Sequence, residues 1–472
     1  MTTAVSSKIC IIGAGISGLT AATLLIKQGY DVTIFEREEI PGGRALSLDG
    51  STLTIDLYKT ILSRFNMEVA FSEPDLPTIF SNNMLDGYQL DLGYHAIGGG
   101  VFSNVNNLLY QLNGHVDILE SYVGLIKEHG YNFPFLSRWD KIKIFPNILR
   151  LLFASERTLQ RLDKVSITET IHKYGKGKMK LILEIFSRSI TTVNNLDRIS
   201  TGEMFRSQRN LYRGSKPVGY PKRGLAFIHK KLVDYITSQG GTIRLGTPVE
   251  KIRIQDGKAV GVQVGGKDID FDVVISSILI QDLFSLADSK NFPKEFVDQM
   301  TRLEGTGSLC AYYALREVPS GLLGKTFHFI ERNIGVDGGD AVGMVDFMAA
   351  HPESGISPHG CYLVQSYVIC TPQEARNKTL QGTLKDLLDQ NLCRLIPEYK
   401  QHVLWALYPT IWHLDGVAKT IDNVKPHIIT PVENLFVIGD CVKAMGIGFN
   451  CALNSARLLI EHLGIQQQSS RL

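Results

Sequence analysis

The sequence predicts an α/β protein of two lobes, in which a Rossmann-like sheet is assembled from three separate segments and a second, α+β lobe is built from the segments between them. Three observations support this fold class: a length of 472 residues, a strand-helix-strand pattern near the start, and two later stretches with apolar strands. A single core stops growing at roughly 250 to 300 residues. A chain of this length is therefore expected to form more than one lobe.

The opening stretch, residues 8–36, has the pattern of a β-α-β unit. KICIIGAG is a short apolar strand, ISGLTAATLLIKQG has helical periodicity, and YDVTIFE is a second strand. Two later stretches contain the apolar strands FDVVISS and ENLFVIGD. The helix GLAFIHKKLVDYITSQGG and a hairpin precede the first of these strands, and the helix NCALNSARLLIEHL follows the second. We expect all three stretches to build one domain.

The domain division that follows is interleaved in sequence. Residues 1–100, 215–290 and 420–472 are expected to form the Rossmann-like domain. The second domain is assigned to residues 101–214, which look largely helical, and 291–419, in which residues 306–370 alternate and carry aromatic residues typical of sheet. This second domain is expected to face the substrate.

The composition is that of an ordinary globular protein. Apolar residues make up 44% and charged residues 20% of the chain, and the net charge is +2. A balance so close to neutral gives no reason to expect a polyanionic partner. Nucleic acid is therefore excluded from the predicted partners, and a small molecule is expected instead.

Cysteine usage and hydropathy indicate a cytoplasmic location. The seven cysteines are scattered, without a CxxC pair or a histidine cluster at zinc-ligand spacing, so we predict reduced thiols and no metal site. The N-terminal apolar run is the first strand itself, not the core of a signal peptide. No uncharged apolar run reaches the roughly 18 residues of a spanning helix, although attachment to a membrane surface remains open.

A glycine pattern marks the junction between the first strand and the first helix. Gly13, Gly15 and Gly18 form GxGxxG in the context that binds a pyrophosphate. The first glycine permits a tight turn, the second lets the backbone approach the phosphates, and the third lets helix and strand pack closely. Ile16 and Ser17 complete the helix N-terminus, which attracts negative charge. A glycine turn without a ligand is the alternative interpretation.

Glu36 ends the second strand, eighteen residues after the last glycine of the pattern. A carboxylate at this place can accept hydrogen bonds from the adenosine ribose hydroxyls and disfavours a 2′-phosphate. Its neighbour Arg37 is expected to lie at the same end of the cofactor. Only one strand-GxGxxG-helix unit is visible, so a second dinucleotide has no support.

The next turn, Pro41-Gly42-Gly43-Arg44, adds a family resemblance. ICIIGAGISGLTAATLL and VTIFEREEIPGGRA together resemble the opening of the FAD-dependent amine oxidase and phytoene desaturase superfamily. The resemblance implies a Rossmann-like FAD-binding domain of the glutathione-reductase type, with FAD as the cofactor. It also implies that Gly43 and Arg44 lie against the pyrophosphate and flavin, a role that suits a guanidinium. An exposed surface arginine is the alternative.

Further segments carry the same resemblance. GTPVEKI resembles the family strand whose valine meets the adenine, here Val249, and KPVGYPKRGLAFIHKKL resembles another family stretch except that Arg223 replaces a glycine, which could bring a new side chain to the flavin edge. The terminal segment ENLFVIGDCVKAMGIGFNCALNSA resembles the family's GD motif. The resemblance assigns Gly439 and Asp440 to the ribityl chain and places a helix N-terminus at the pyrimidine end of the flavin, formed by Gly448, Phe449 and Asn450. For Asp440, a simple helix cap is the alternative.

His95 is the candidate for a residue that touches substrate or a proton. It lies in GYQLDLGYHAIGGG, where relatives place residues over the flavin, but this segment follows GGRA after some forty residues instead of about ten, which indicates an insertion near 47–86. A structural histidine is the other interpretation. Four aromatic residues before the GD motif could wall the pocket or pack against the sheet: Trp405, Tyr408, Trp412 and His413.

Residues 132–164 mix Phe, Ile and Leu with Arg and Lys but contain few acids. Such a composition could lie on a bilayer surface and admit a lipophilic substrate. Packing of an amphipathic helix into the core is the alternative. The sequence therefore leaves peripheral membrane contact open.

Taken with the resemblance, these features predict an FAD-dependent oxidoreductase of the phytoene desaturase type. It would move a hydride between flavin N5 and an apolar substrate, of isoprenoid or polyene character, in desaturation, saturation or isomerisation. A flavin amine oxidase is the second hypothesis and would require an aromatic cage over the flavin. A flavin-binding scaffold without turnover is the third.

Overall fold

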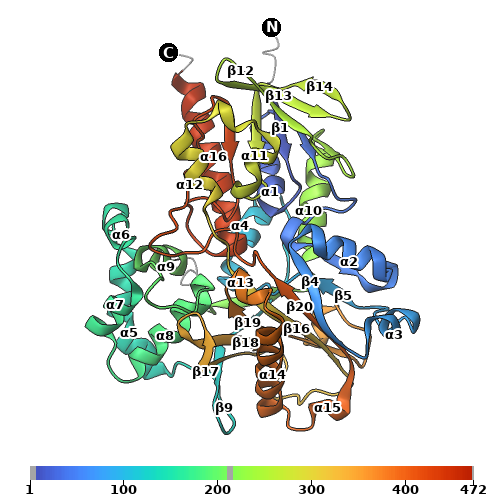
Figure 1. The fold of residues 1–472 in the computed structure, drawn as a ribbon, viewed down its shortest axis with the longest axis vertical. Coiled ribbons are helices and arrows are strands. Elements are labelled where there is room, and N and C mark those ends of the chain that lie inside the picture. Colours follow the sequence, from blue (N-terminus) through green and yellow to red (C-terminus); the bar gives the residue numbers. More distant parts are fainter. Residues whose placement is uncertain (1–6, 210–215, 470–472) are drawn as a thin grey trace.

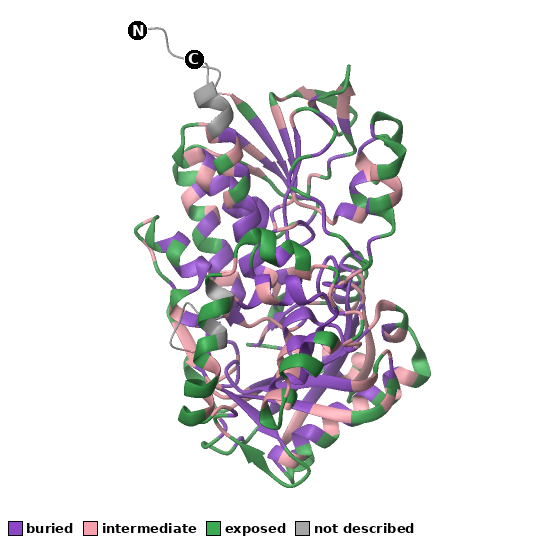
Figure 2. Cartoon of the chain, turned by 90° about the vertical axis from the view of Figure 1, so that its left-hand side faces the viewer, coloured by how far each residue is buried: buried purple, intermediate pink, exposed green. Residues whose placement is uncertain are grey.

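The computed structural model describes residues 7–209 and 216–469 and shows two lobes joined along the long axis of the molecule (Figure 1). Buried residues run through the interior of both lobes, and exposed residues gather on the outer helices and loops (Figure 2). The two lobes therefore form one continuous body, with the chain passing between them several times.

One lobe is built on a parallel five-stranded sheet. The strand order is β11-β2-β1-β15-β21, and each strand pairs in parallel with its neighbours. The strands come from three distant stretches of sequence: β1 (Lys8–Ile12), β2 (Asp31–Phe35), β11 (Thr242–Arg244), β15 (Val273–Ser276) and β21 (Leu435–Val437). This sheet confirms the predicted Rossmann-like fold class and its assembly from separate segments.

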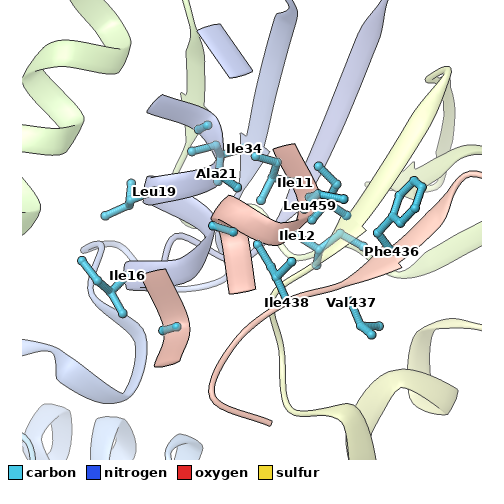
Figure 3. Close-up of a cluster of buried hydrophobic side chains, with 14 of the residues drawn as sticks. Ile11, Ile12, Ile16, Leu19, Ala21, Ile34, Phe436, Val437, Ile438 and Leu459 are labelled. Atoms are coloured by element: carbon cyan, nitrogen blue, oxygen red, sulfur yellow. The ribbon is translucent and has the colours of Figure 1, made fainter. Parts of the chain in front are cut away.

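Helix α1 (Ile16–Lys27) lies against this sheet and packs on α10 (Gly224–Ser238) and α16 (Gly448–Ser469). Its first eight residues are all buried because the helix is enclosed on several sides. Figure 3 shows the resulting cluster, in which side chains of β1, α1, β2, β21 and α16 meet. The apolar runs recognised in the sequence are thus buried on both faces, as parallel strands require.

The second lobe contains an eight-stranded sheet with the order β4-β20-β16-β19-β18-β17-β8-β9. Its central strand β16 is buried along all nine residues, and helix α14 (Lys378–Leu395) packs on β16, β18 and β19. The strands span β4 (Met67–Glu73), β8 (Val123–Ile126), β9 (Tyr131–Asn132), β16 (Gly307–Leu315), β17 (Thr326–Val336), β18 (Gly339–Asp346), β19 (Tyr362–Cys370) and β20 (Val403–Ile411).

A group of helices stands beside the large sheet, at the lower left of Figure 1. Helix α8 of this group packs on β17 and β18. The group agrees with the helical character expected for residues 101–214, although the same stretch also contributes the short strands β7, β8 and β9, which the sequence did not reveal. Its members are α5 (Arg138–Leu152), α6 (Glu156–Leu162), α7 (Ile167–Tyr174), α8 (Lys178–Thr191) and α9 (Thr201–Gln208).

The insertion expected near residues 47–86 forms α2 (Ile55–Arg64), β4 and α3 (Leu76–Ser81). Strand β4 pairs antiparallel with β20 and so completes an edge of the large sheet. Strand β4 lies within residues 1–100, which we assigned to the Rossmann-like domain. The domain boundaries remain a prediction.

The remaining elements are smaller. The hairpin expected between helix α10 and strand β15 is present as β12 and β13, and β14 extends it. The remaining bounds are β3 (Ser47–Asp49), β5 (Gln89–Asp91), β6 (Ile97–Gly98), β7 (Ile118–Ser121), β10 (Val218–Pro221), β12 (Lys251–Gln255), β13 (Lys258–Val264), β14 (Lys267–Asp270), α4 (Asn104–Tyr110), α11 (Leu283–Leu286), α12 (Lys294–Thr301), α13 (Pro372–Ala375) and α15 (Tyr399–His402).

Candidate active site

A cavity of about 550 Å³ lies where the two lobes meet. Its wall includes every residue that the sequence assigned to a cofactor or catalytic role except Gly18: Gly13, Gly15, Ile16, Ser17, Glu36, Arg37, Gly43, Arg44, His95, Val249, Gly439, Asp440, Gly448, Phe449 and Asn450. These residues come from three distant stretches of sequence, and the fold brings them to one surface.

The glycine turn forms one wall of the cavity. Gly13 has a φ of +100°, which favours glycine, and Gly15 is the N-cap of α1. Helix α1 has no side-chain cap and no acidic residue in its first turn, so its first amides are available to an anion. A Cβ on Gly18 would lie 2.1 Å from the carbonyl oxygen of Gly13. Gly18 therefore allows close packing and does not touch the cavity, as the motif's third glycine should.

Glu36 follows β2 and turns toward the glycine turn. Its Oε2 accepts a hydrogen bond of 2.6 Å from the amide of Ala14, and its Oε1 accepts one of 3.0 Å from the amide of Glu38. Burial raises the pKa of the Glu36 carboxyl. The Glu36 carbonyl accepts from the amide of Thr247, which brings Val249 to the same part of the wall. Each carboxylate oxygen keeps a lone pair for a ligand hydroxyl.

The GGR turn lies against the start of α1. Gly42 and Gly15 form an isolated bridge, and the turn carries Arg44 to Asp440, with which it forms a salt bridge. The other Asp440 oxygen accepts from the amide of Gly416 at 2.9 Å. Burial alone would raise the pKa of Asp440, but the Arg44 guanidinium holds it well below its ordinary value. The Asp440 carboxylate is therefore charged and lies on the cavity wall. A simple helix cap, the alternative interpretation, does not describe these contacts.

His95 lies beside Phe449 on the cavity wall, with their ring centroids 5.9 Å apart in edge-to-face contact. Its Nε2 is 2.7 Å from the carbonyl oxygen of Leu92 and 3.3 Å from that of Arg44. Because carbonyls only accept, Nε2 must carry the hydrogen and Nδ1 is the bare nitrogen. Burial lowers the pKa of His95, so the ring is neutral at pH 7.

Asn450 lies in the first turn of α16 and is 2% exposed. Its Nδ2 donates to the carbonyl of Gly98 at 2.9 Å, whereas its buried Oδ1 has no hydrogen-bond partner among the described residues. A buried acceptor without a partner is costly unless a ligand satisfies it. Asn450 therefore carries a buried acceptor that the described residues leave unsatisfied.

The remainder of the cavity, here called the chamber, is walled mainly by the second lobe. Its residues are mostly apolar or aromatic: Tyr94, Val123, Phe186, Ser189, Ile190, His328, Met344, Tyr367, Leu414 and Ile447. Seven of them lie on strands β8, β17, β18 and β19 or on helix α8, where no motif marks them, so the sequence did not point to them. Tyr94 and Tyr367 stack with ring centroids 4.7 Å apart. The chamber therefore offers an apolar surface next to the motif residues.

Two possibilities raised for the cavity wall are not realised in the structure. Arg223 is exposed and lies over the ring of Phe227, so its side chain does not reach the cavity. The four aromatic residues before the GD motif do not wall the pocket either; Trp405 and Tyr408 are buried in the core of the large sheet, and the chain reaches the cavity only at Leu414 and Asp415. Packing against the sheet, the alternative interpretation, accounts for them.

The family follows from comparison with known proteins. The model of the family described as flavin containing amine oxidoreductase matches residues 16–458. The chain belongs to this family. The match confirms the superfamily expected from the sequence and FAD as the cofactor, because the family is one of flavoproteins.

Individual relatives of this flavin oxidoreductase are distant. It is 26% identical over 295 residues to a phytoene desaturase (neurosporene-forming) of Rhodobacter capsulatus, covering 57% of this chain and 51% of the relative. It is 23% identical over 315 residues to a chloroplastic prolycopene isomerase of Daucus carota, covering 60% and 48%. The chain thus spans about half the length of the curated relatives it matches.

Among solved structures, an oxidoreductase from Methanosarcina mazei has a TM-score of 0.69 at 20% identity, covering 96% of this chain and all of that one. This likeness confirms the fold.

No group of three or more His, Cys, Asp or Glu side chains within residues 7–209 and 216–469 is placed to hold a metal ion. In the same ranges, no helix is long and apolar enough to cross a bilayer.

Proposed function

We propose that this flavoprotein is an oxidoreductase of the phytoene desaturase type that acts on an apolar, isoprenoid-like molecule by desaturation, saturation or isomerisation. One observation carries the proposal: a single cavity joins the dinucleotide motif residues to an apolar chamber. The desaturase and isomerase relatives support the same substrate class.

The residues of the cavity wall suit FAD along its length. The amides at the start of α1 would hold the pyrophosphate, Glu36 the adenosine ribose, and Val249 the adenine end, with Arg37 beside it. Arg44 and Asp440 would face the ribityl and flavin part, and the α16 N-terminus, with the unsatisfied Asn450 Oδ1, would meet the flavin ring. Ile16, Ser17, Gly43, Gly439, Gly448 and Phe449 supply the surrounding surface.

FAD, when bound, supplies a hydride acceptor or donor at N5. The chain's own contribution is to exclude water from the chamber, to orient the apolar substrate and to handle one proton. His95 suits the last task because it lines the cavity and its Nδ1 is a bare, neutral proton acceptor.

The chamber disfavours an amine substrate. An aromatic cage needs room for a cation between its rings, whereas Tyr94 and Tyr367 stack at 4.7 Å and leave no such gap. A flavin-binding scaffold without turnover is the remaining alternative, and it would leave the bound flavin unreduced by every substrate.

An anaerobic titration tests the proposal. The flavin absorption band of the purified protein is followed while a polyprenoid, a primary amine and NAD(P)H are added in turn. We expect the polyprenoid to bleach the band, or NAD(P)H to bleach it and the polyprenoid to restore it. Bleaching by the amine alone would favour the amine oxidase, and an unchanged band with all three would favour the scaffold.

We also propose that helix α5 rests on a membrane surface through which the substrate enters. Trp139 is 73% exposed and Phe153, just after the helix, 83%, and Ile142 and Phe145 between them are exposed as well. The helix sequence RWDKIKIFPNILRLL carries four basic residues and one acid, which complements anionic lipid. The inner side of α5 packs near Phe186, a chamber residue.

Vesicle sedimentation tests the membrane contact. Binding to phosphatidylserine vesicles is expected to exceed binding to phosphatidylcholine vesicles and to fall at least fivefold when Trp139 and Phe153 are both replaced by serine. Ile429→Ser, an exposed apolar residue elsewhere on the chain, is the matched control. Equal binding by both variants would contradict the contact.

A further inference from the structure

The chamber wall carries a hydrogen-bonded polar pair among mostly apolar and aromatic residues. Ser189 of α8 and His328 of β17 both line the cavity, and the Ser189 Oγ lies 3.1 Å from the His328 Nδ1. Their neighbours on the wall include Val123, Ile190 and Met344, which offer no hydrogen bond of comparable strength.

The pair is held rigidly by its surroundings. Helix α8 packs on β17 and β18, and Phe186, one turn before Ser189, meets the His328 ring edge to face at 5.5 Å. His328 is only 3% exposed. Two polar groups fixed in an apolar wall form a built site, because a substrate that covers them without bonding to them loses their hydration.

The charge of the pair limits what it can bind. Burial lowers the pKa of His328 to about 4, so the imidazole is neutral at pH 7. Among the described residues that line the cavity, the cationic ones are Arg37, Arg44 and Arg64, and Arg44 is already paired with Asp440 in the motif half. An anionic headgroup at the pair would therefore lack a counter-charge. A cationic ammonium group would lack one as well, because neither Ser189 nor His328 is a carboxylate.

A hydroxyl group fits the pair best. The ring nitrogen bonded to Ser189 has only one hydrogen or one lone pair, so the substrate hydroxyl bonds to the Ser189 Oγ. It donates to Oγ when Ser189 donates to the ring, and it accepts from Oγ when the ring donates to Ser189. An ether or a hydrocarbon lacks the donor.

We propose that Ser189 and His328 form a subsite for a hydroxyl group carried by the apolar substrate. This inference rests on the proposed function and narrows its substrate class from a pure hydrocarbon to a long-chain, isoprenoid-like alcohol. The apolar wall binds the chain, and the pair sets its position along the chamber by holding the oxygen.

Ligand binding to the holoprotein tests the subsite. The probes are farnesol and farnesyl methyl ether, with 1-dodecanol and its methyl ether as a second matched pair, and the readout is the perturbation of the flavin absorption band. We expect farnesol to bind about five- to tenfold more tightly than its ether, the worth of one net hydrogen bond. Ser189→Ala should abolish this preference without weakening binding of the ether, and Ile190→Val should preserve it.

The outcomes separate the two levels of the proposal. Equal affinity for farnesol and its ether, or a preference that survives Ser189→Ala, would overturn the subsite and leave the isoprenoid function standing. A Ser189-dependent preference for 1-dodecanol, with no binding of either farnesyl compound, would support the subsite and overturn the isoprenoid assignment. His328→Leu provides a second variant, and its flavin spectrum and melting temperature report whether it folds; a folded His328→Leu that keeps the full preference would also overturn the subsite.

Discussion

Arg44 and Asp440 form a salt bridge on the wall of the cavity although 396 positions separate them in sequence. The guanidinium comes from the turn after the first β-α-β unit, and the carboxylate follows the last strand of the same sheet. The pair therefore joins the beginning of the Rossmann-like lobe to its end, at the place where the motif residues meet the chamber.

Removing one partner should destabilise the protein in a pH-dependent way. Arg44→Ala leaves a buried carboxylate without its cation, and we expect the free energy of unfolding of the FAD-free protein to fall by roughly 2 to 4 kcal/mol at pH 7. The pKa of folded Asp440 lies below its ordinary 3.8, so the pair's contribution is present above that pH and is lost as the pH falls through the folded value. Urea unfolding of wild type and Arg44→Ala is measured at pH 7 and below pH 4. We expect the difference between their free energies of unfolding to be smaller at the lower pH.

A surface pair provides the control for this comparison. Arg253 pairs with Asp270, whose side chain is 87% exposed. Arg253→Ala should change the urea midpoint little at either pH, because exposed ion pairs contribute little to stability. Equal destabilisation by the two variants would show that Arg44 has no special role.

Two glycines of the same motif should respond differently to alanine. A Cβ on Gly18 would lie 2.1 Å from a backbone oxygen, so Gly18→Ala should lower the melting temperature of the FAD-free protein by several degrees. A Cβ on Gly15 would meet its nearest neighbour at 3.9 Å, an ordinary contact. Gly15→Ala should therefore leave the FAD-free protein intact and reduce FAD affinity at least tenfold, because the methyl group occupies the path of the pyrophosphate. If Gly15→Ala retained FAD normally, the pyrophosphate would lie elsewhere.

Comparing the affinities for FAD and FMN separates a ribose contact made by Glu36 from a general effect of the substitution on the structure of the site. Glu36→Gln keeps the size of the side chain but removes its charge, and we expect it to weaken FAD binding about tenfold through the ribose hydroxyls. FMN has no adenosine, so its affinity should not change. Glu39→Gln, an exposed neighbour outside the cavity wall, is the matched control. An equal loss of FAD and FMN affinity would mean that Glu36 supports the turn and not the ribose.

The motif half of the cavity was predictable because its contacts are made by backbone turns and helix ends with a fixed sequence pattern. Gly13 needs a positive φ and Gly18 needs the absence of a Cβ, and both needs are visible as glycines at fixed spacing. The chamber was not predictable for the opposite reason. Ser189 and His328 lie 139 positions apart on a helix and a strand, and nothing in either local sequence indicates that they meet. Short strands such as β9, with two residues, carry too little periodicity to be recognised.

His229 contacts the cavity-wall residue Phe449, and its burial can be tested through stability. It lies on α10 and is 2% exposed, its ring stacks on Phe449, and neither ring nitrogen has a hydrogen-bond partner among the described residues. Burial, with a smaller effect of the nearby His95, lowers the pKa of His229 from 6.5 to about 4. Between these two values the unfolded chain binds a proton that the folded protein does not, so stability falls as the pH falls from 6.5 toward 4.

His229→Leu removes this proton linkage. At pH 5 the wild-type penalty is about 2 kcal/mol, since each unit of pKa difference is worth about 1.4 kcal/mol. The quantity to follow is the free energy of unfolding of His229→Leu minus that of wild type. We expect this difference to increase by about 2 kcal/mol as the pH falls from 7 to 5. Proton binding by the other histidines occurs in both proteins and cancels in the difference. His115→Gln is the control, because the His115 side chain is 64% exposed. A wild-type-to-variant difference that stays constant over this range would show that His229 is already protonated or hydrated in the folded state.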